Sequence, residues 1–150
     1  MRKSIVMEKQ VFYHYLKIDL EQFAIFEENM AADQDVSLGT HEVTFSFDRK
    51  NLILACKENV VFVTGDKPLL KCVQSSYFAI RADSVESMTQ EDGSIVFEPF
   101  LLIQLASLKY GTMRGTIFAK TQGTKFEKII LPPTFFNDSI HEPFVVGKEA

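Results

Sequence analysis

Several residue types and motifs that catalytic and metal sites require are scarce or missing in this sequence of 150 residues. Tryptophan is absent, and the three histidines, His14, His41 and His141, stand alone and match no metal-binding motif such as HExxH. There is no GxSxG sequence for a nucleophilic serine, and GTMRGT lacks the spacing and the Gly-Lys-Ser/Thr end of a phosphate-binding loop. We therefore expect a protein that is not an enzyme and that uses no cofactor and no metal.

Cysteine is also scarce. Cys56 and Cys72 fall in predicted strands and lack the spacing of metal ligands, although pairing of either thiol with a histidine in space stays open. Adjacent carboxylates occur at Glu27-Glu28 and Glu91-Asp92, in predicted loops, where solvated charges are more common than an acid–base pair. We interpret the cysteines as reduced, buried thiols of a cytoplasmic protein.

Positive charge is in deficit, and long apolar runs are missing. The chain has 16 basic and 20 acidic residues, a net charge of −4, and its lysines and arginines are scattered, which argues against a nucleic-acid partner. The first ten residues, MRKSIVMEKQ, carry no apolar run typical of a signal peptide. No segment approaches 18 uninterrupted apolar residues, so we expect no membrane insertion.

The stretch from Glu98 to Pro133 dominates what is present. Pro99 suits the first turn of a helix, and Gly123 suits the position just after its end. Leu101, Leu105 and Leu108 share one helical face. Phe100, Ile103, Tyr110 and Ile117 form a second apolar face. Apolar surface on two sides predicts cover on two sides, by a sheet of the same chain and by a second helix or subunit.

Small residues recur along this helix at every fourth position: Ser107, Gly111, Gly115 and Ala119. Such a row lets a second helix approach closely, so we predict a subunit interface there. Two glycines cost about 1 kcal/mol each in a helix interior and require a compensating contact. The alternative is that Gly111 or Gly115 ends or kinks the helix.

Before this helix, alternating apolar and aromatic residues predict four strands. They are 11–18, 36–47, 52–64 and 69–81, with a possible bulge at 57–59. After the first strand we expect a separate segment over 19–30 and a crossing loop over 31–35. Later in the chain we expect a polar loop over 82–93, a short extended piece over 126–131 and a helical turn near 137–141. Strands segregated from helices give an α+β class: a four-stranded antiparallel sheet followed by one long helix packed on it.

Phenylalanine is abundant, with 14 copies. Those in predicted strands, such as Phe45 and Phe78, suit the core. Six apolar side chains in predicted loops or tail instead suggest a groove that binds polypeptide, although closing the core stays an equal alternative for the aromatic ones. They are Phe23, Phe26, Met30, Phe135, Phe136 and Phe144.

At these residues the chain resembles SecB, the bacterial export chaperone. The run KPLLKCVQSSYFAI (67–80) corresponds to a family strand of the type FLxEVxxxGIF, and GTKFEKIILPPTFF (123–136) corresponds to the post-helix signature RGTFPxLxLxPVNF. YLKIDLEQF (15–23) resembles the family's YxKDxSFE segment with one residue inserted. The resemblance covers about residues 15–136 and implies a single SecB-like domain over 1–150; whether the tail from about 137 is ordered stays open.

The resemblance implies an ATP-independent holdase that binds unfolded polypeptide, assembles as a homotetramer (a dimer of dimers) through the main helices, and serves protein export. It places peptide grooves at about 23–30 and 135–144. The family's acidic residue linked to SecA binding is not matched, because this chain has Lys71 and Cys72 there, whereas Asp19 can correspond to the aspartate of the first strand. The family's C-terminal helix and basic tail are missing, so SecA is a doubtful partner.

Two alternatives to the chaperone hypothesis remain. One is a non-catalytic assembly or adaptor subunit with one dedicated protein partner, for example in a toxin–antitoxin system. The other is a small enzyme or ligand-binding domain with a closed, polar cavity between helix and sheet, for which the sequence offers no convergent residues.

Overall fold

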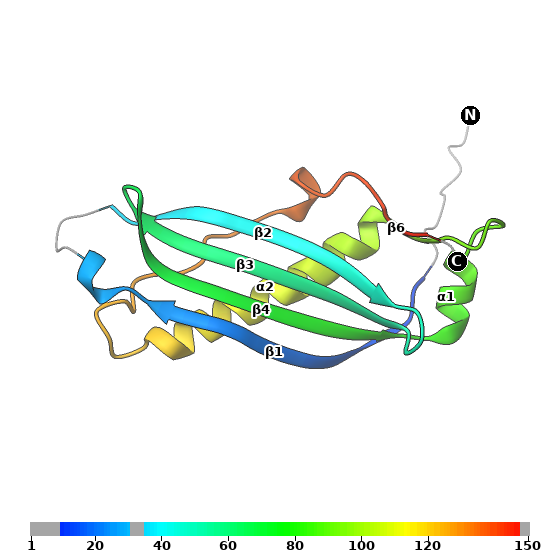
Figure 1. Cartoon of the computed structure of the whole chain (residues 1–150), viewed down its shortest axis with the longest axis horizontal. Helices are drawn as coiled ribbons and strands as arrows, with labels where there is room; N and C mark the ends of the chain where they lie inside the picture. Colours follow the sequence, from blue (N-terminus) through cyan, green and yellow to red (C-terminus); the bar gives the residue numbers. More distant parts are fainter. Residues whose placement is uncertain (1–9, 31–34, 148–150) are drawn as a thin grey trace, which may run out of the picture.

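The computed structural model describes residues 10–30 and 35–147, and the predicted crossing loop at 31–35 lies largely outside the described residues. Four long strands form one antiparallel sheet in the order β1-β4-β3-β2. They are β1 (Tyr13–Ile25), β2 (Ser37–Asp48), β3 (Ile53–Thr64) and β4 (Lys67–Ile80). Helix α2 (Pro99–Thr121) runs across one face of this sheet, so the predicted α+β architecture is confirmed (Figure 1).

Strand β1 is longer than predicted, because it continues through residues assigned to a separate segment and ends at Ile25. Its register against β4 shifts between Tyr15 and Lys17 and again between Leu20 and Gln22. Each extra residue reverses the alternation of faces, so a simple period of two does not run through the strand. The short 3-10 helix η1 (Glu27–Asn29) follows and is tied to β4, where the Asn29 side-chain amide donates to the Pro68 carbonyl at 2.7 Å.

The bulge predicted at residues 57–59 was wrong. These residues pair regularly with β2 and β4, and the shift in β3 lies between Phe62 and Val63. Glu58 is fully buried and shares the helix-facing side of β3 with Cys56 and Val60. The polar interruption of the apolar run is therefore a buried charge in a regular strand, and not a kink.

The segment from residue 82 to 93 contains a helix that the sequence did not suggest. Helix α1 (Ala82–Met88) is short and buries Ser84, Val85 and Met88. It leads into β5 (Ile95–Phe97), which pairs with β6 (Phe144–Val146) near the end of the chain. The tail also contains the 3-10 helix η2 (Phe136–Asp138), close to the predicted helical turn.

Helix α2 is continuous through Gly111 and Gly115, so neither glycine ends it. It stops at Thr121, and Gly123 has a φ of +79°, as expected for the left-handed residue that follows a helix. The sheet-facing side of α2 buries Leu101, Leu102, Leu105, Ala106, Lys109, Tyr110, Met113, Ile117 and Thr121. Leu108 was predicted to share the face of Leu101 and Leu105, but its side chain is 43% exposed.

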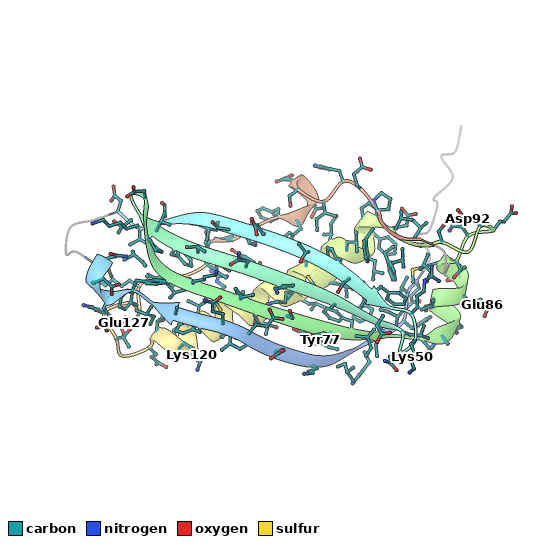
Figure 2. The ribbon with its side chains drawn as sticks, viewed as in Figure 1. Lys50, Tyr77, Glu86, Asp92, Lys120 and Glu127 are labelled. Atoms are coloured by element: carbon teal, nitrogen blue, oxygen red, sulfur yellow. The ribbon has the colours of Figure 1, made fainter. Side chains whose placement is uncertain are left out.

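Two apolar clusters fill the space between the sheet and α2. Core A consists of Val60, Phe62, Leu69, Leu70, Cys72, Ala106, Tyr110, Met113, Ile117, Phe126, Ile129, Leu131 and Phe136. Core B consists of Leu54, Cys56, Phe78, Ile80, Val85, Met88, Ile95, Phe97, Leu101, Leu102 and Leu105. Figure 2 shows that Lys120, in the last turn of α2, and Glu127, in the segment after it, lie at the opposite end of the molecule from Glu86 and Asp92.

Candidate functional site

The outer surface of α2 carries the predicted row of small residues, and all four side-chain positions are exposed. Apart from the surrounding helix itself, a Cβ atom built on Gly111 or Gly115 would meet no atom of the described residues within 4 Å. A larger side chain would therefore fit at either position in the single chain, so nothing found there explains two residues of low helix propensity. The row is open surface in the single chain, and its role as a subunit interface remains a prediction.

An apolar groove borders this row. It has a volume of about 370 Å³ and is lined by Gly111, Arg114, Gly115, Phe118, Ile129 and Ile130. Phe118 and Ile130 are 55% and 54% exposed, large values for apolar side chains. The return segment that forms the second wall is held in place because the Tyr110 hydroxyl donates to the Pro132 carbonyl, and Ile129 is buried in core A.

The structure divides the predicted polypeptide-binding residues between the two ends of the molecule. Phe23 and Met30 are half-buried and pack against core A, and the Lys120 ammonium lies 6.0 Å from the Phe23 ring. Phe26 is also half-buried, and its backbone N–H donates to the Leu69 carbonyl. Phe144 instead packs at core B, so the set does not line one continuous groove.

The two adjacent phenylalanines of the tail have opposite environments. Phe135 is 74% exposed, the most exposed of the large apolar side chains that the structure describes. Phe136 is 4% exposed and packs against Tyr110 and His41 with ring-centroid distances of 5.7 and 5.9 Å. In this conformation Phe135 is available to a partner, whereas Phe136 closes core A.

A polar layer that the sequence analysis did not foresee lies between core A and core B. The Lys109 ammonium donates to Gln74 Oε1 at 2.8 Å and lies 3.7 Å from Glu58 Oε1, and all three residues are buried. The second oxygen of Glu58 lies 2.5 Å from His41 Nε2, while Gln74 donates to the Thr116 hydroxyl. One signal was present, because Glu58 continues the buried alternation of Cys56 and Val60.

Burial sets the proton affinities around this layer. Desolvation lowers the pKa of Lys109, although the nearby Glu58 carboxylate opposes that effect. Desolvation raises the pKa of Cys56 to about 12 and that of Cys72 to about 11. The thiols therefore stay protonated at neutral pH, and neither is a reactive thiolate.

The polar layer does not form a metal site. No group of three or more His, Cys, Asp and Glu side chains within residues 10–30 and 35–147 has the arrangement to hold a metal ion. Both cysteines are buried and free.

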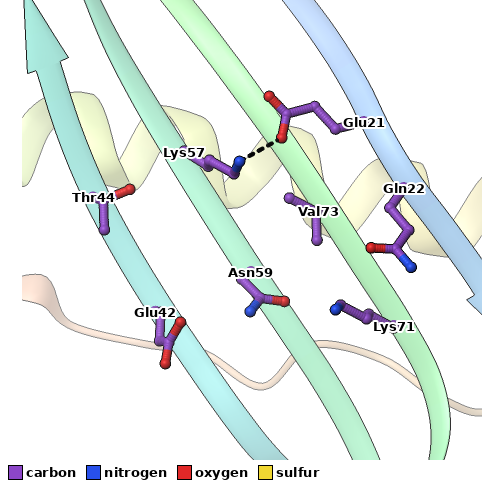
Figure 3. A pocket seen from close by; sticks show the side chains of 8 residues that line it. All are labelled: Glu21, Gln22, Glu42, Thr44, Lys57, Asn59, Lys71 and Val73. Carbon is purple, nitrogen blue, oxygen red and sulfur yellow. Dashed lines mark ion pairs between the residues drawn. The ribbon is translucent and has the colours of Figure 1, made fainter.

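The face of the sheet opposite α2 holds a shallow, polar depression of about 500 Å³ (Figure 3). Charged side chains from all four strands line it, among them Glu21, Glu42, Lys57 and Lys71. Lys57 pairs with Glu21 at 2.8 Å, and this hydrogen bond lowers the pKa of Glu21 and raises that of Lys57. Both signs of charge are present, so the depression has no strong preference for anions or cations.

Comparison with known proteins identifies the fold. No protein-family model and no curated protein sequence matches this chain. Among solved structures, the chain is similar to a SecB-like chaperone from Mycobacterium tuberculosis in complex with a ChAD peptide from the HigA1 antitoxin. The TM-score is 0.51 at 8% identity, over 81% of this chain and 90% of that chain.

A second similar structure is a protein of unknown function from Streptococcus agalactiae, with a TM-score of 0.39 at 13% identity over 85% of this chain and 100% of that chain. Across the part of the chain that the structure describes, no helix is long and apolar enough to cross a membrane. The order of the strands, the helix packed on one face of the sheet, and the similarity to the mycobacterial chaperone together show that this chain has a SecB-like fold.

Proposed function

We propose that this protein is an ATP-independent holdase chaperone that binds unfolded or non-native polypeptides in the cytoplasm, with protein export as one use. The observation that carries the proposal is a SecB-like fold with exposed, large apolar side chains on α2 and on the segment that follows it. These side chains are Leu108, Phe118, Ile130 and Phe135. Apolar surface gathered on one part of a protein is typical of a partner site.

Binding would follow from burial of apolar area, at about 25 cal/mol per Å², without covalent chemistry. Phe135 is our principal candidate for client contact because it is 74% exposed. Phe23, Phe26 and Met30 form a second candidate area near the C-terminal end of α2, where the Lys120 ammonium lies 6.0 Å from the Phe23 ring. Phe136 and Phe144 would contact a client only after local rearrangement, since they pack against core A and core B respectively.

We further propose that the row Ser107–Gly111–Gly115–Ala119 mediates self-association to a dimer or tetramer. The row is exposed, and a Cβ added at Gly111 would meet nothing within 4 Å among the described residues beyond the surrounding helix. Gly111→Leu therefore distinguishes two cases. On a free surface it favours the helix by roughly 1 kcal/mol, whereas at a helix interface it overfills the contact and lowers the mass in solution.

The test of chaperone function is light scattering with and without a reduced, permanently unfolded model protein, together with suppression of its aggregation. We expect uptake of the unfolded chain, and weaker uptake by Phe135→Ser than by Thr134→Ser, which alters the neighbouring exposed residue. Normal aggregation in the presence of equimolar protein would exclude a general holdase. Lys50→Leu, on the exposed β2–β3 turn, is the control for adding one apolar side chain in the association experiment.

The second candidate function is a non-catalytic adaptor with one dedicated partner. It is favoured by Lys71, which stands where the family has an acidic residue linked to SecA binding and lines the depression on the open sheet face. The mycobacterial protein of similar fold is bound to an antitoxin peptide, which is also compatible with a dedicated partner. Failure to protect several unrelated unfolded proteins, combined with tight binding to one, would favour the adaptor.

A further inference from the structure

Strand β6 is a small element with few attachments. It has three residues and pairs with the three residues of β5: Phe97 opposite Phe144, Val96 opposite Val145, and Ile95 opposite Val146. Among the described residues, this two-stranded sheet is separate from the main one. Two short strands contribute little stability by themselves, so the attachment of β6 depends on its side chains.

Phe144 is the largest side chain that attaches β6. The Phe144 ring stacks on Phe97 at a centroid distance of 5.8 Å and on Phe45 at 6.3 Å. Phe97 is fully buried, whereas Val145 on the opposite side of β6 is 51% exposed. Phe144 and Val146 therefore point inward and Val145 points outward. A peptide that adds to the edge of a sheet shows the same alternation.

The surface under β6 belongs to parts of the chain that are held independently of it. Phe97 lies at the centre of core B, and Ile95 also bridges to Thr89 on its other side. Phe45 belongs to β2, within the main sheet. Arg49, in the β2–β3 turn, donates to the carbonyls of Gly93, Val146 and Gly147. Two of these carbonyls lie at the end of β6, so Arg49 binds the backbone there and makes no contact that depends on the side chains of β6.

The residues directly before β6 are exposed to solvent. Ile140, after η2, packs against both cores, and His141, Glu142 and Pro143 then connect it to β6 without burial. Figure 1 shows β6 at the edge of the molecule, near the end of the chain. Short terminal elements with few buried contacts open at low free energy, well below the cost of global unfolding.

We propose that β5, with Phe45 and Phe97, is a strand-acceptor site and that β6 is its removable internal occupant. Its external ligand is an extended, apolar polypeptide segment with an aromatic residue followed two positions later by a β-branched one, as in Phe144-Val145-Val146. This inference deepens the proposed chaperone function by naming a class of client segment. Since β6 covers the site, only molecules in which β6 is detached can bind such a segment. The apparent affinity is therefore the intrinsic affinity multiplied by the fraction of molecules in that state.

The test uses the full-length chain and a fluorescent peptide with the sequence Glu-Pro-Phe-Val-Val-Gly, monitored by anisotropy. Phe144→Ala removes the anchor of β6 and leaves the acceptor unchanged. We expect it to bind the peptide at least tenfold more tightly than the wild type. Val145→Ala, which alters the exposed side of the same strand, is the matched control and should stay within about threefold of the wild type.

A second peptide with alanine in place of phenylalanine tests the chemistry, and we expect it not to bind. Hydrogen exchange should show that the first peptide restores protection to the amides of Ile95–Phe97 in Phe144→Ala. If Phe144→Ala does not fold cooperatively, Val146→Ala shortens the second inward side chain of β6, leaves the acceptor unchanged and should increase binding in the same direction.

A folded Phe144→Ala that fails to bind the peptide, or that binds both peptides equally, would overturn the proposal. The result is separate from that of the aggregation assay. A protein that protects unfolded chains but shows no phenylalanine-dependent peptide binding is a chaperone with its client site elsewhere. A protein that binds the peptide but protects no unfolded chain has the acceptor site without general holdase activity.

Discussion

Core A and core B lie side by side under one helix, but they are closed in different ways. Core A is covered by the return segment after α2, which inserts Phe126, Ile129, Leu131 and Phe136 and is anchored through Tyr110 to Pro132. Core B is covered by the short elements α1, β5 and β6. The polar layer of Glu58, Gln74 and Lys109 separates the two cores.

Because of this difference, we expect core A and core B to differ in local stability, although they share one sheet and one helix. The cover of core A is a continuous chain with four buried apolar anchors, whereas β6 covers core B with partly buried side chains. The separating charges require a fixed geometry, because a buried charge that loses its partner is costly. We therefore expect a substitution in core A to affect core A more than core B, and the reverse for a substitution in core B.

The largest effects should come from emptying each core. Phe97→Ala in core B and Phe126→Ala in core A each remove a ring with at most 1% exposure, and each should lower the free energy of unfolding by about 3–5 kcal/mol. Hydrogen exchange should increase first in α1 and β6 for Phe97→Ala and in residues 129–136 for Phe126→Ala. Equal acceleration in both halves by both variants would show that the cores are one cooperative unit.

Breaking the polar layer should have the next largest effect. Lys109→Met retains the length of the side chain but leaves the buried Glu58 with His41 as its remaining partner, at a cost of about 3 kcal/mol in denaturant unfolding. Replacing the layer as a whole, with Glu58→Leu, Gln74→Leu and Lys109→Met together, should recover most of that loss because the desolvated charges are gone. A triple variant less stable than Lys109→Met would show that the layer makes a net stabilising contribution.

The free energy of unfolding should depend on the two buried thiols at alkaline pH. Their folded pKa values, about 12 for Cys56 and about 11 for Cys72, lie above the ordinary value of 9.0, so the folded state retains protons that the unfolded chain releases. Stability is therefore unaffected by the thiols below about pH 9 and falls above it, by about 1.4 kcal/mol per pH unit for each thiol. The lowered pKa of Lys109 acts in the opposite direction, with stability rising toward pH 10.5.

The measurement is thermal or denaturant unfolding from pH 8 to 11 for the wild type, Cys56→Ala and Cys72→Ala, all of which retain Lys109. Each variant should lose less stability with rising pH than the wild type. The difference in slope between the wild type and Cys56→Ala should persist up to pH 11, whereas the difference for Cys72→Ala should begin to flatten there, because the pKa is about 12 for Cys56 and about 11 for Cys72. Parallel curves for all three proteins would mean that the thiols ionise equally in both states.

The smallest effect should come from the open face of the sheet. Lys57 and Glu21 form a solvent-screened pair at 2.8 Å, with the Lys57 side chain 52% exposed. Removing either partner should change the free energy of unfolding by less than about 1 kcal/mol, and salt should reduce even this difference. A loss comparable to that of Lys109→Met would contradict the distinction between exposed and buried charges.

Much of the fold could be predicted from local patterns. The alternation in β2, β3 and β4 and the bounds set by Pro99 and Gly123 identified the main strands and α2. Helix α1 was missed because seven residues give less than two full turns of periodic pattern. The full length of β1 was missed because two register shifts interrupt its alternation.

The candidate sites were less accessible to sequence reasoning. The small-residue row and the exposed Phe135 could be identified as surface features because each is a local property. The opposite environments of Phe135 and Phe136 could not, because η2 turns one ring toward Tyr110 and the other toward solvent.

The sequence by itself determined the class of the long segments, the main strands and α2, since side chains of suitable period can bury one face. Only the tertiary structure decided that Glu58 meets Lys109 across 51 positions, and that Phe144 closes core B against Phe45 and Phe97. The physical reason is that burial patterns specify which face of an element avoids water, but not which distant face covers it. That choice is made by packing, by the pairing of buried charges and by strand register acting together.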